Sequence, residues 1–369
     1  MSSLSLIIFS SLAILSLSLE RLLIRKQYIV PDLYQKYINK YNNVLTIAVF
    51  LVASLRHPYT GTDTAAYYAQ YVNNIDNYVD LKYYWYQIIN SLRDGTFRDG
   101  FTWEFFNKLL SYIIKDGQLW LAVVSGIFIY AVYITIKRYS NDSVLSWVYI
   151  IYMYIFLFVL QGLRQSVAMA IVLLSFKYVK ERKIIKFILM ILLSTLFHQS
   201  SWVFLIVYPL YRFPVNGVCF WIMGGVFLIS KVLPSIIVTI FSGLASNSRF
   251  LGYLEGRNNM YSSTGFFVLL FIFILCYMNR KYLLTKDEDS KILYTISMLG
   301  VATQATASIV AEMFRISYYF SMFNMLLVAN TISSIENKRI RKRISYAVII
   351  MFLLYFYVSG IFRYRFFWQ

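Results

Sequence analysis

Three arginines lie directly beside long apolar segments, where their charge is costly. Arg56 ends one apolar run, and Arg164 and Arg315 each open another. A charge at membrane depth costs at least about 2.5 kcal/mol, so an arginine held there is a candidate functional residue. A guanidinium binds phosphate oxygens through two parallel hydrogen bonds, and clustered arginines stabilise charge on a phosphate leaving group. The three residues therefore favour a lipid pyrophosphate site at one membrane edge, with anchoring to lipid headgroups as the alternative.

Two further residues are candidates for proton transfer. His198 lies between two apolar runs, and an imidazole with an ordinary pKa of about 6.5 is suited to general base catalysis near neutral pH. Asp63 follows Gly61 in the stretch GTDT and would need a raised pKa for the same role. His198 could instead be a neutral loop residue, and Asp63 could cap a helix N-terminus, which is worth about 1 kcal/mol. Both residues remain candidates for the base.

Three tyrosines follow Asp63 in the stretch AAYYAQY, which has helical spacing. Tyr67, Tyr68 and Tyr71 could stack on sugar rings, or they could form an aromatic belt at the membrane surface. Residues 56–71 thus combine a cation, a carboxylate and aromatic rings at the end of one apolar segment.

The composition is that of a polytopic membrane protein. Of the 369 residues, 59% are hydrophobic and 14% are charged, whereas a soluble domain carries about 25% charged residues. The net charge of +18 comes from Lys and Arg in short loops, so it does not indicate a nucleic-acid partner. Two cysteines in apolar runs and two histidines predict neither a disulfide nor a metal site. We expect one integral membrane domain over residues 1–369.

The apolar runs predict about twelve membrane-spanning helices. Some are shorter than a straight span requires, so 184–197 and 200–211 could be half-helices, and 233–244 could be re-entrant. The spans are about 3–19, 44–56, 118–136, 143–160, 163–179, 184–197, 200–211, 216–232, 264–280, 291–309, 314–333 and 345–362.

The distribution of cations predicts the topology. One set of loops contains 22 of the 35 Lys and Arg residues, Lys183 and Arg341 among them, and this set is assigned to the cytoplasm. Both termini, Asp63 and His198 then lie outside, as do long loops at about 57–117 and 233–263. Residues 101–115 have helical apolar spacing and predict a helix in the membrane interface. No internal repeat is seen, which argues against transporter folds built from duplicated halves.

The sequence resembles the EpsG-type branch of the Wzy-like polysaccharide polymerases. The family's Glu-Pro-Gly pattern after the first outer loop is replaced here by WEFF. The resemblance rests on LRHPYTGTDTAAYYAQY (55–71), FTWEFFNKL (101–109), GLRQSVAMAIVLLSF (162–176), LLSTLFHQSSWVF (192–204) and EMFRISYYF (312–320).

The resemblance implies a GT-C-like all-helical fold and an inverting, metal-independent glycosyltransferase that needs no cofactor. Such an enzyme joins oligosaccharide repeat units carried on undecaprenyl pyrophosphate, at the outer face of the bacterial inner membrane, for O-antigen, lipopolysaccharide or exopolysaccharide. Its expected partners are the lipid-linked donor and acceptor, the bilayer, and a chain-length regulator and a flippase of the same pathway. A flippase or transporter for the same lipid-linked glycan, or an O-antigen ligase, is the alternative.

The resemblance also implies roles for individual residues. Arg164 and Arg315 would hold the pyrophosphate with help from Arg56, and either His198 or Asp63 would take the proton of the acceptor hydroxyl. The other candidate substrate-binding residues are Thr62, Tyr67, Tyr68, Tyr71, Gln165, Arg249, Arg257, Glu312 and Tyr318.

Overall fold

A computed structural model describes residues 3–30, 33–76, 79–95, 99–244, 263–310, 312–359 and 363–369. Within these ranges the regular secondary structure is helical, which confirms the all-α prediction. The chain forms two compact units: the first comprises Met1–Trp202 and Asn337–Gln369, and the second comprises Val203–Glu336. Two such units can belong to one membrane domain, so the single-domain prediction stays a prediction.

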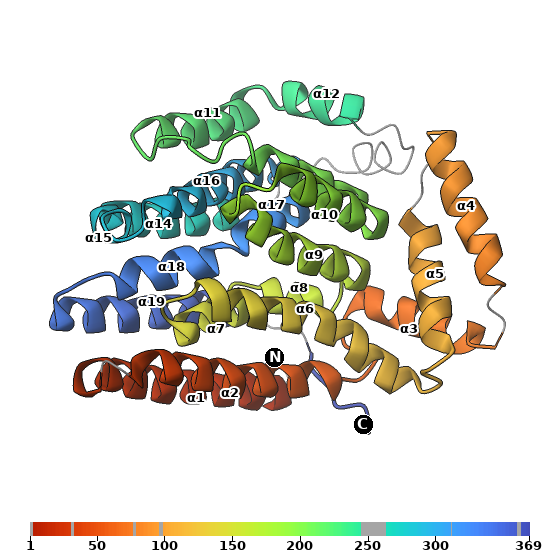
Figure 1. Cartoon of the computed structure of the whole chain (residues 1–369), viewed down its shortest axis with the longest axis horizontal. Helices are drawn as coiled ribbons and strands as arrows, with labels where there is room; N and C mark the ends of the chain where they lie inside the picture. The colour runs from red at the N-terminus through yellow and green to blue at the C-terminus, as the bar shows by residue number, and fades with distance from the viewer. Residues whose placement is uncertain are drawn as a thin grey trace. The chain divides into compact units, whose positions relative to one another are not determined.

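The first unit is built from antiparallel helices (Figure 1). Helix α2 packs against α6, α6 against α9, and α9 against α10, while α1 and α19 both contact α7. The helices are α1 (Ser3–Ile29), α2 (Tyr34–Ser54), α6 (Gly117–Tyr139), α7 (Ser143–Tyr152), α8 (Ile155–Val159), α9 (Leu163–Lys180), α10 (Ile184–Phe197) and α19 (Lys338–Val358).

Two segments of the first unit, Leu4–Lys26 and Gly117–Tyr139, are long and apolar enough to cross a membrane. Each is a 23-residue stretch, and a helix of about 20 residues spans the hydrocarbon core of a bilayer. Asp116 caps the second of these helices by accepting a hydrogen bond from the backbone N–H of Leu119 at 2.7 Å. The boundary between polar loop and apolar helix is therefore fixed at residue 116.

Three polar-rich helices gather at the end of the first unit where α2 stops and α6 begins (Figure 1). These are α3 (Thr62–Asn74), α4 (Leu81–Arg93) and α5 (Asp99–Ser111). Helix α5 confirms the helix predicted over 101–115, but it is more than a surface helix, because Trp103 is buried and α5 contacts α10. Sequence reasoning missed α4.

The C-terminal segment returns to the same end of the first unit. Arg56 and Phe366 form an isolated antiparallel bridge. The backbone N–H of His57 donates to the carbonyl of Arg365 at 2.8 Å, and that of Phe367 donates to the carbonyl of Leu55 at 2.9 Å. The residues that follow α2 are therefore held by main-chain hydrogen bonds to the last residues of the chain.

The second unit is centred on α16, which packs against α11, α14 and α17. Gly300 of α16 allows α17 to approach closely, since a Cβ there would lie 3.2 Å from the backbone nitrogen of Ser321. The elements of this unit are α11 (Val218–Val232), α12 (Pro234–Leu244), α14 (Thr264–Met278), α15 (Arg280–Leu284), η3 (Glu288–Ser290), α16 (Lys291–Thr306), α17 (Met313–Ser321) and α18 (Asn324–Ser333).

Each predicted span falls on a helical element, but not all are single α-helices. The span 143–160 is divided into α7 and α8 at Tyr154, which has a left-handed φ of 61°. The Tyr154 hydroxyl donates to the carbonyl of Phe356 in α19 at 2.9 Å, a tertiary contact that accompanies the break. The span 314–333 is divided into α17 and α18. Much of 200–211 is the 3₁₀ helix Gln199–Val207. Twelve membrane passes remain a prediction.

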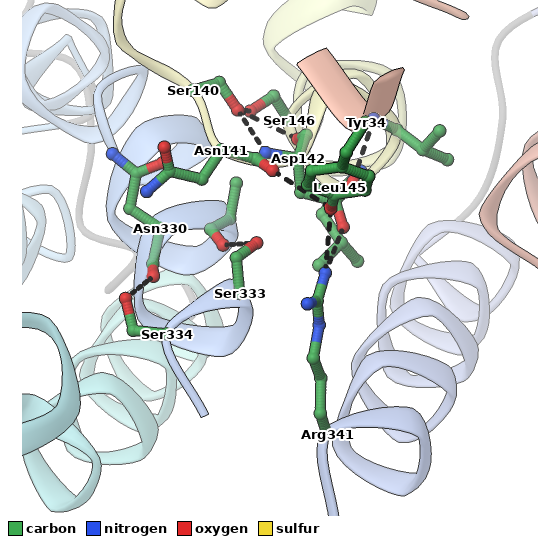
Figure 2. A network of polar contacts seen from close by, with 12 residues as sticks. Tyr34, Ser140, Asn141, Asp142, Leu145, Ser146, Asn330, Ser333, Ser334 and Arg341 are labelled. Carbon is green, nitrogen blue, oxygen red and sulfur yellow. Dashed lines mark hydrogen bonds and ion pairs between the residues drawn. The ribbon is translucent and has the colours of Figure 1, made fainter. Parts of the chain in front are cut away.

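A cluster of charged residues lies inside the first unit (Figure 2). Arg341 of α19 lies 3.7 Å from the Asp142 carboxylate, and the two side chains are 1% and 0% exposed. Nη2 of Arg341 also donates to the Tyr34 hydroxyl at 3.0 Å. The carboxyl of Glu20 is completely buried and interacts electrostatically with both Asp142 and Arg341. The Arg341 side chain is therefore paired with a carboxylate in the protein interior, and the side of the membrane on which it lies stays a prediction.

Candidate functional site

Two of the sequence stretches singled out above pack directly against each other. Gly61 is the N-cap of α3 and has φ of 106°, a conformation that favours glycine. A Cβ at this position would lie only 2.6 Å from Cγ of Gln161. One turn further on, the Thr64 hydroxyl donates to the carbonyl of Leu160. The start of α3 is thereby fixed against the loop that leads into α9.

Arg164 lies in the first turn of α9, and α3 positions its side chain. Its Nε donates to the Tyr67 hydroxyl at 2.9 Å, and its Cζ lies 5.6 Å from the centre of the Tyr67 ring. A Cβ on Gly100 would lie 3.9 Å from Nη1 of Arg164, so α5 borders the guanidinium on another side. The N-terminus of this 18-residue helix adds partial positive charge. The half-buried Arg164 is therefore suited to bind an anion.

Glu104 of α5 is the acidic residue of this site, and sequence reasoning gave it no role. Burial raises the pKa of the Glu104 carboxyl, and the positive charge of Arg164 partly opposes that rise. The carboxylate is thus within electrostatic reach of the guanidinium. The available signal was its position as the single acidic residue of the predicted helix 101–115.

A row of aromatic rings links this arginine to the end of α10. The ring of Tyr67 lies 5.5 Å from that of Trp103, which lies 5.8 Å from that of Phe106. Phe106 in turn meets Phe197 edge-on, with ring centres 5.6 Å apart. Because Phe197 directly precedes His198, α5 brings the histidine to the same end of the first unit as Arg164.

The surroundings of His198 orient its imidazole. His198 is the C-cap of α10, and its Nδ1 lies 2.8 Å from the Ser200 hydroxyl oxygen. Its carbonyl accepts the backbone N–H of Ser201 at 3.1 Å. The side chain is half-buried. The hydrogen bond between the serine hydroxyl and Nδ1 fixes the rotation of the ring. A general base needs such a fixed orientation to reach the proton that it takes.

Asp63 does not have the capping role considered from the sequence. Gly61 occupies the N-cap, and Asp63 lies in the first turn of α3 after Thr62, the first residue of the helix. A carboxylate in this position interacts favourably with the positive end of the helix dipole. Asp63 is half-buried, and its proposed role as a base stays a prediction.

Three predicted substrate-binding residues are buried in the first unit. Arg56 is 0% exposed, and its Nη1 donates to Oγ of Ser125 at 2.8 Å. Tyr71 is also 0% exposed, donates its hydroxyl to the carbonyl of Ile114 at 2.7 Å and stacks on Trp120. Both side chains are therefore enclosed by packing in this structure, and their contacts with substrate stay a prediction. Gln165 is likewise buried, at 2% exposure.

The remaining candidates belong to the second unit or lie outside the described residues. Arg315 lies in the first turn of α17 with its Cζ 5.8 Å from the centre of the Phe314 ring, and its backbone N–H donates to the carbonyl of Glu312. Tyr318 meets Phe314 edge-on at 5.6 Å. These residues form a local group within the second unit. The predicted sites Arg249 and Arg257 lie outside the described residues.

A pocket near the end of α2 was not foreseen. It has a volume of about 620 Å³, and its lining includes His57, Tyr59, Tyr68 and Asp116. All of the lining residues belong to the first unit. Sequence reasoning considered Tyr68 alone and gave His57 no role, because the lining residues follow no motif spacing.

Long apolar helices with a polar, arginine-bearing end place the chain in the class of helical membrane proteins. The EpsG family matches residues 39–369, nearly the whole chain, and the chain therefore belongs to the EpsG family. This is a Wzy-like family of polymerase type, so membership indicates a function like that of a polysaccharide polymerase. No match was found among curated proteins or solved structures.

Proposed function

We propose that this protein is a polysaccharide polymerase that joins lipid-linked oligosaccharide repeat units at the outer face of the bacterial inner membrane. Family membership supports the polymerase class. The observation that carries the proposal is Arg164, held at the N-terminus of α9 by Tyr67 and beside α5. This arrangement offers a planar guanidinium and a helix dipole to one anion, as a pyrophosphate leaving group requires.

In the proposed reaction a hydroxyl of the acceptor sugar attacks the anomeric carbon of the donor glycan. The bond from that carbon to the pyrophosphate oxygen breaks as the new glycosidic bond forms, and the configuration is inverted. The electron pair of the broken bond leaves with undecaprenyl pyrophosphate, whose growing charge Arg164 stabilises. Arg315 is proposed as a second pyrophosphate ligand, and this role rests on the sequence alone.

A base must take the proton of the attacking hydroxyl. We favour His198, because its ordinary pKa is suited to the role and the Ser200 hydroxyl orients its ring. Asp63 is the second candidate. Tyr67 is proposed to position Arg164 through its hydrogen bond, and Thr62, Tyr68, Glu312 and Tyr318 remain proposed contacts to substrate.

The proposed arrangement in the membrane has twelve passes and both termini outside. Cysteine replacement with a membrane-impermeant thiol reagent tests it: Asp63→Cys should react in intact cells, and Lys183→Cys only after permeabilisation. Arg341 is a poor probe, because its side chain is buried. The reverse labelling pattern would invert the topology and remove the argument for an outer site.

The glycan profile of a strain lacking this protein tests the function. A lost polymerase leaves single repeat units attached at the cell surface, because flipping and ligation continue. A lost flippase leaves no surface glycan, and a lost ligase leaves polymer that stays on the lipid carrier. Complementation with the parent protein should restore the full ladder of chain lengths. The flippase or the ligase profile would refute the proposed polymerase reaction.

A further inference from the structure

The pocket near the end of α2 has the size and the construction of a ligand site. Its volume of about 620 Å³ lies within the range of about 300–1,000 Å³ that is usual for small-molecule pockets. It is formed by the residues after α2, by the first turns of α6 and by Tyr68 of α3. Main-chain hydrogen bonds from His57 and Phe367 fix the floor to the C-terminal segment. The pocket is open to the surface on one side, and its floor is held in place by ordered backbone.

Individual polar groups of the pocket are fixed by local contacts. Nδ1 of His57 accepts the backbone N–H of Tyr59 at 3.1 Å, so Nε2 of the neutral ring carries the proton and can donate. The amide nitrogen of Gln118 donates to the carbonyl of Arg56 at 3.0 Å, which leaves the amide oxygen to accept. Asp116 uses one carboxylate oxygen to cap α6, and the second oxygen remains an acceptor.

The tyrosines supply rings and hydroxyl groups. A Cβ on Gly117 would lie 2.8 Å from Cε2 of Tyr68, so this ring packs directly against the start of α6. Burial raises the pKa of Tyr68, and the nearby Asp116 carboxylate and Tyr59 add to the rise, so the hydroxyl stays protonated. The side chain of Tyr59 is 74% exposed and offers a free ring face.

The charge of the lining selects the ligand. Its described residues include one carboxylate, Asp116, and neither Lys nor Arg. A carboxylate repels phosphate and accepts hydroxyl protons, so the pocket disfavours an anion and suits an uncharged group rich in hydroxyls. Apolar residues such as Leu119 and Ala122 complete the wall on the α6 side. The tyrosine rings can pack on the apolar face of a sugar ring. The donors and acceptors beside them can form hydrogen bonds with its hydroxyl groups.

This pocket is separate from the arginine site, although α3 contributes to both. Tyr67 contacts Arg164, and the next residue, Tyr68, lines the pocket. Consecutive residues of a helix point about 100° apart, because a turn contains about 3.6 residues. Helix α3 therefore borders the arginine site with one side chain and the pocket with the next.

We propose that the pocket formed by His57, Tyr59, Tyr68, Asp116 and Gln118 is a glycan subsite that binds uncharged sugar residues of the polysaccharide chain, apart from the group bound by Arg164. This rests on the proposed function for the identity of the glycan. The subsite holds the sugar part of a substrate while the arginine site holds its pyrophosphate. A bound chain would then stay on the enzyme between additions.

The test uses the purified full chain in detergent and two probes. The first probe is a mixture of neutral oligosaccharides released from the native polysaccharide by partial acid hydrolysis, without lipid or phosphate, detected by saturation-transfer NMR. The second probe is inorganic pyrophosphate. Tyr59→Ala removes an exposed ring, and Asp116→Asn removes a charge but keeps a helix cap. Tyr86→Ala, at an exposed tyrosine of α4 outside the pocket, is the matched control.

The parent and Tyr86→Ala should bind the oligosaccharides equally, and Tyr59→Ala should weaken that binding by about tenfold or more. Asp116→Asn should weaken it by a smaller factor. Arg164→Lys should keep oligosaccharide binding and lose pyrophosphate binding. If the parent binds no oligosaccharide, or Tyr59→Ala binds as the parent does, the subsite is refuted. If Arg164→Lys binds pyrophosphate normally and produces a full glycan ladder, the arginine role fails while the subsite stands.

Discussion

Replacement of Arg341 by methionine should destabilise the first unit strongly. The substitution keeps an unbranched apolar stem but removes the positive charge 3.7 Å from Asp142 and the hydrogen bond to Tyr34. Both charged side chains are at most 1% exposed, so water cannot take the place of the lost partner. Removing one partner of a buried ion pair costs about 3–5 kcal/mol. That is a large part of a typical unfolding free energy of about 5–15 kcal/mol.

The measurement is the free energy of unfolding of purified protein in mixed micelles, followed by near-UV circular dichroism as a denaturing detergent is added. Arg339→Met is the control, because Arg339 lies on the same helix with an exposed side chain and should change stability by less than about 0.5 kcal/mol. The double variant Asp142→Asn/Arg341→Met should recover part of the loss, because asparagine keeps the cap on α7 and carries no charge.

The pH dependence of the unfolding free energy provides a second test of the same cluster. Burial raises the pKa of Asp142, and the positive charge of Arg341 opposes that rise, so removing Arg341 should raise the pKa further. A carboxyl whose pKa is raised by folding destabilises the folded state above its unfolded pKa, and this cost is lost as the pH falls through the folded value. The deficit of Arg341→Met should therefore be smaller at about pH 5 than at about pH 8. A deficit below about 1 kcal/mol at the higher pH would refute this account of the cluster.

Three further substitutions test the candidate site and its scaffold. Arg164→Lys keeps the charge but loses the planar fork, so polymerisation of lipid-linked repeat units in vitro should fall more than tenfold, about 1.4 kcal/mol of transition-state stabilisation; parent-like glycan ladders would make Arg164 a lipid anchor. His198→Ala should abolish turnover while donor binding persists, and parent activity should fall as the pH drops through the histidine range. Near-normal turnover in His198→Ala with an inactive, folded Asp63→Asn would transfer the base role to the aspartate. Gly61→Ala should cost about 1–3 kcal/mol of stability, because φ is 106° and Gln161 leaves no room for a Cβ; Gly224→Ala, where a Cβ meets no atom within 4 Å, should be close to neutral, and equal effects would contradict the strain argument.

The positions of the long apolar helices followed from the sequence because an apolar segment of suitable length has few alternatives in a membrane protein. The sequence stretches at 61–71 and 162–176 likewise pointed to Arg164 and Tyr67, which the structure brings together. Their packing could not be anticipated, since it depends on Gly61 contacting Gln161 a hundred residues later. Spacing along a chain does not report contacts of this range.

Burial of individual charges was the part that the sequence did not predict. Arg56 was placed at the outer end of its span because the apolar run ends there, and Arg341 was assigned to the cytoplasm by the count of loop cations. Neither argument takes account of partners. The guanidinium of Arg56 donates to Ser125 of α6, and that of Arg341 pairs with Asp142 at the start of α7. Both partners are far away in sequence. The break at Tyr154 was missed for the same reason, as its contact lies in α19.

The division of the chain has a consequence for the order of biosynthesis. The second unit is one continuous segment, Val203–Glu336, inserted into the first unit, whose last part begins at Asn337. A ribosome completes the inserted unit before it makes Arg341, whose partner Tyr34 lies 307 residues earlier in the chain. The first unit must therefore wait, with the carboxyls of Glu20 and Asp142 lacking their cation, until α19 is inserted. Chains that terminate early would keep these buried carboxyls without their cation, which gives membrane proteases and chaperones a means to distinguish unfinished copies from completed ones.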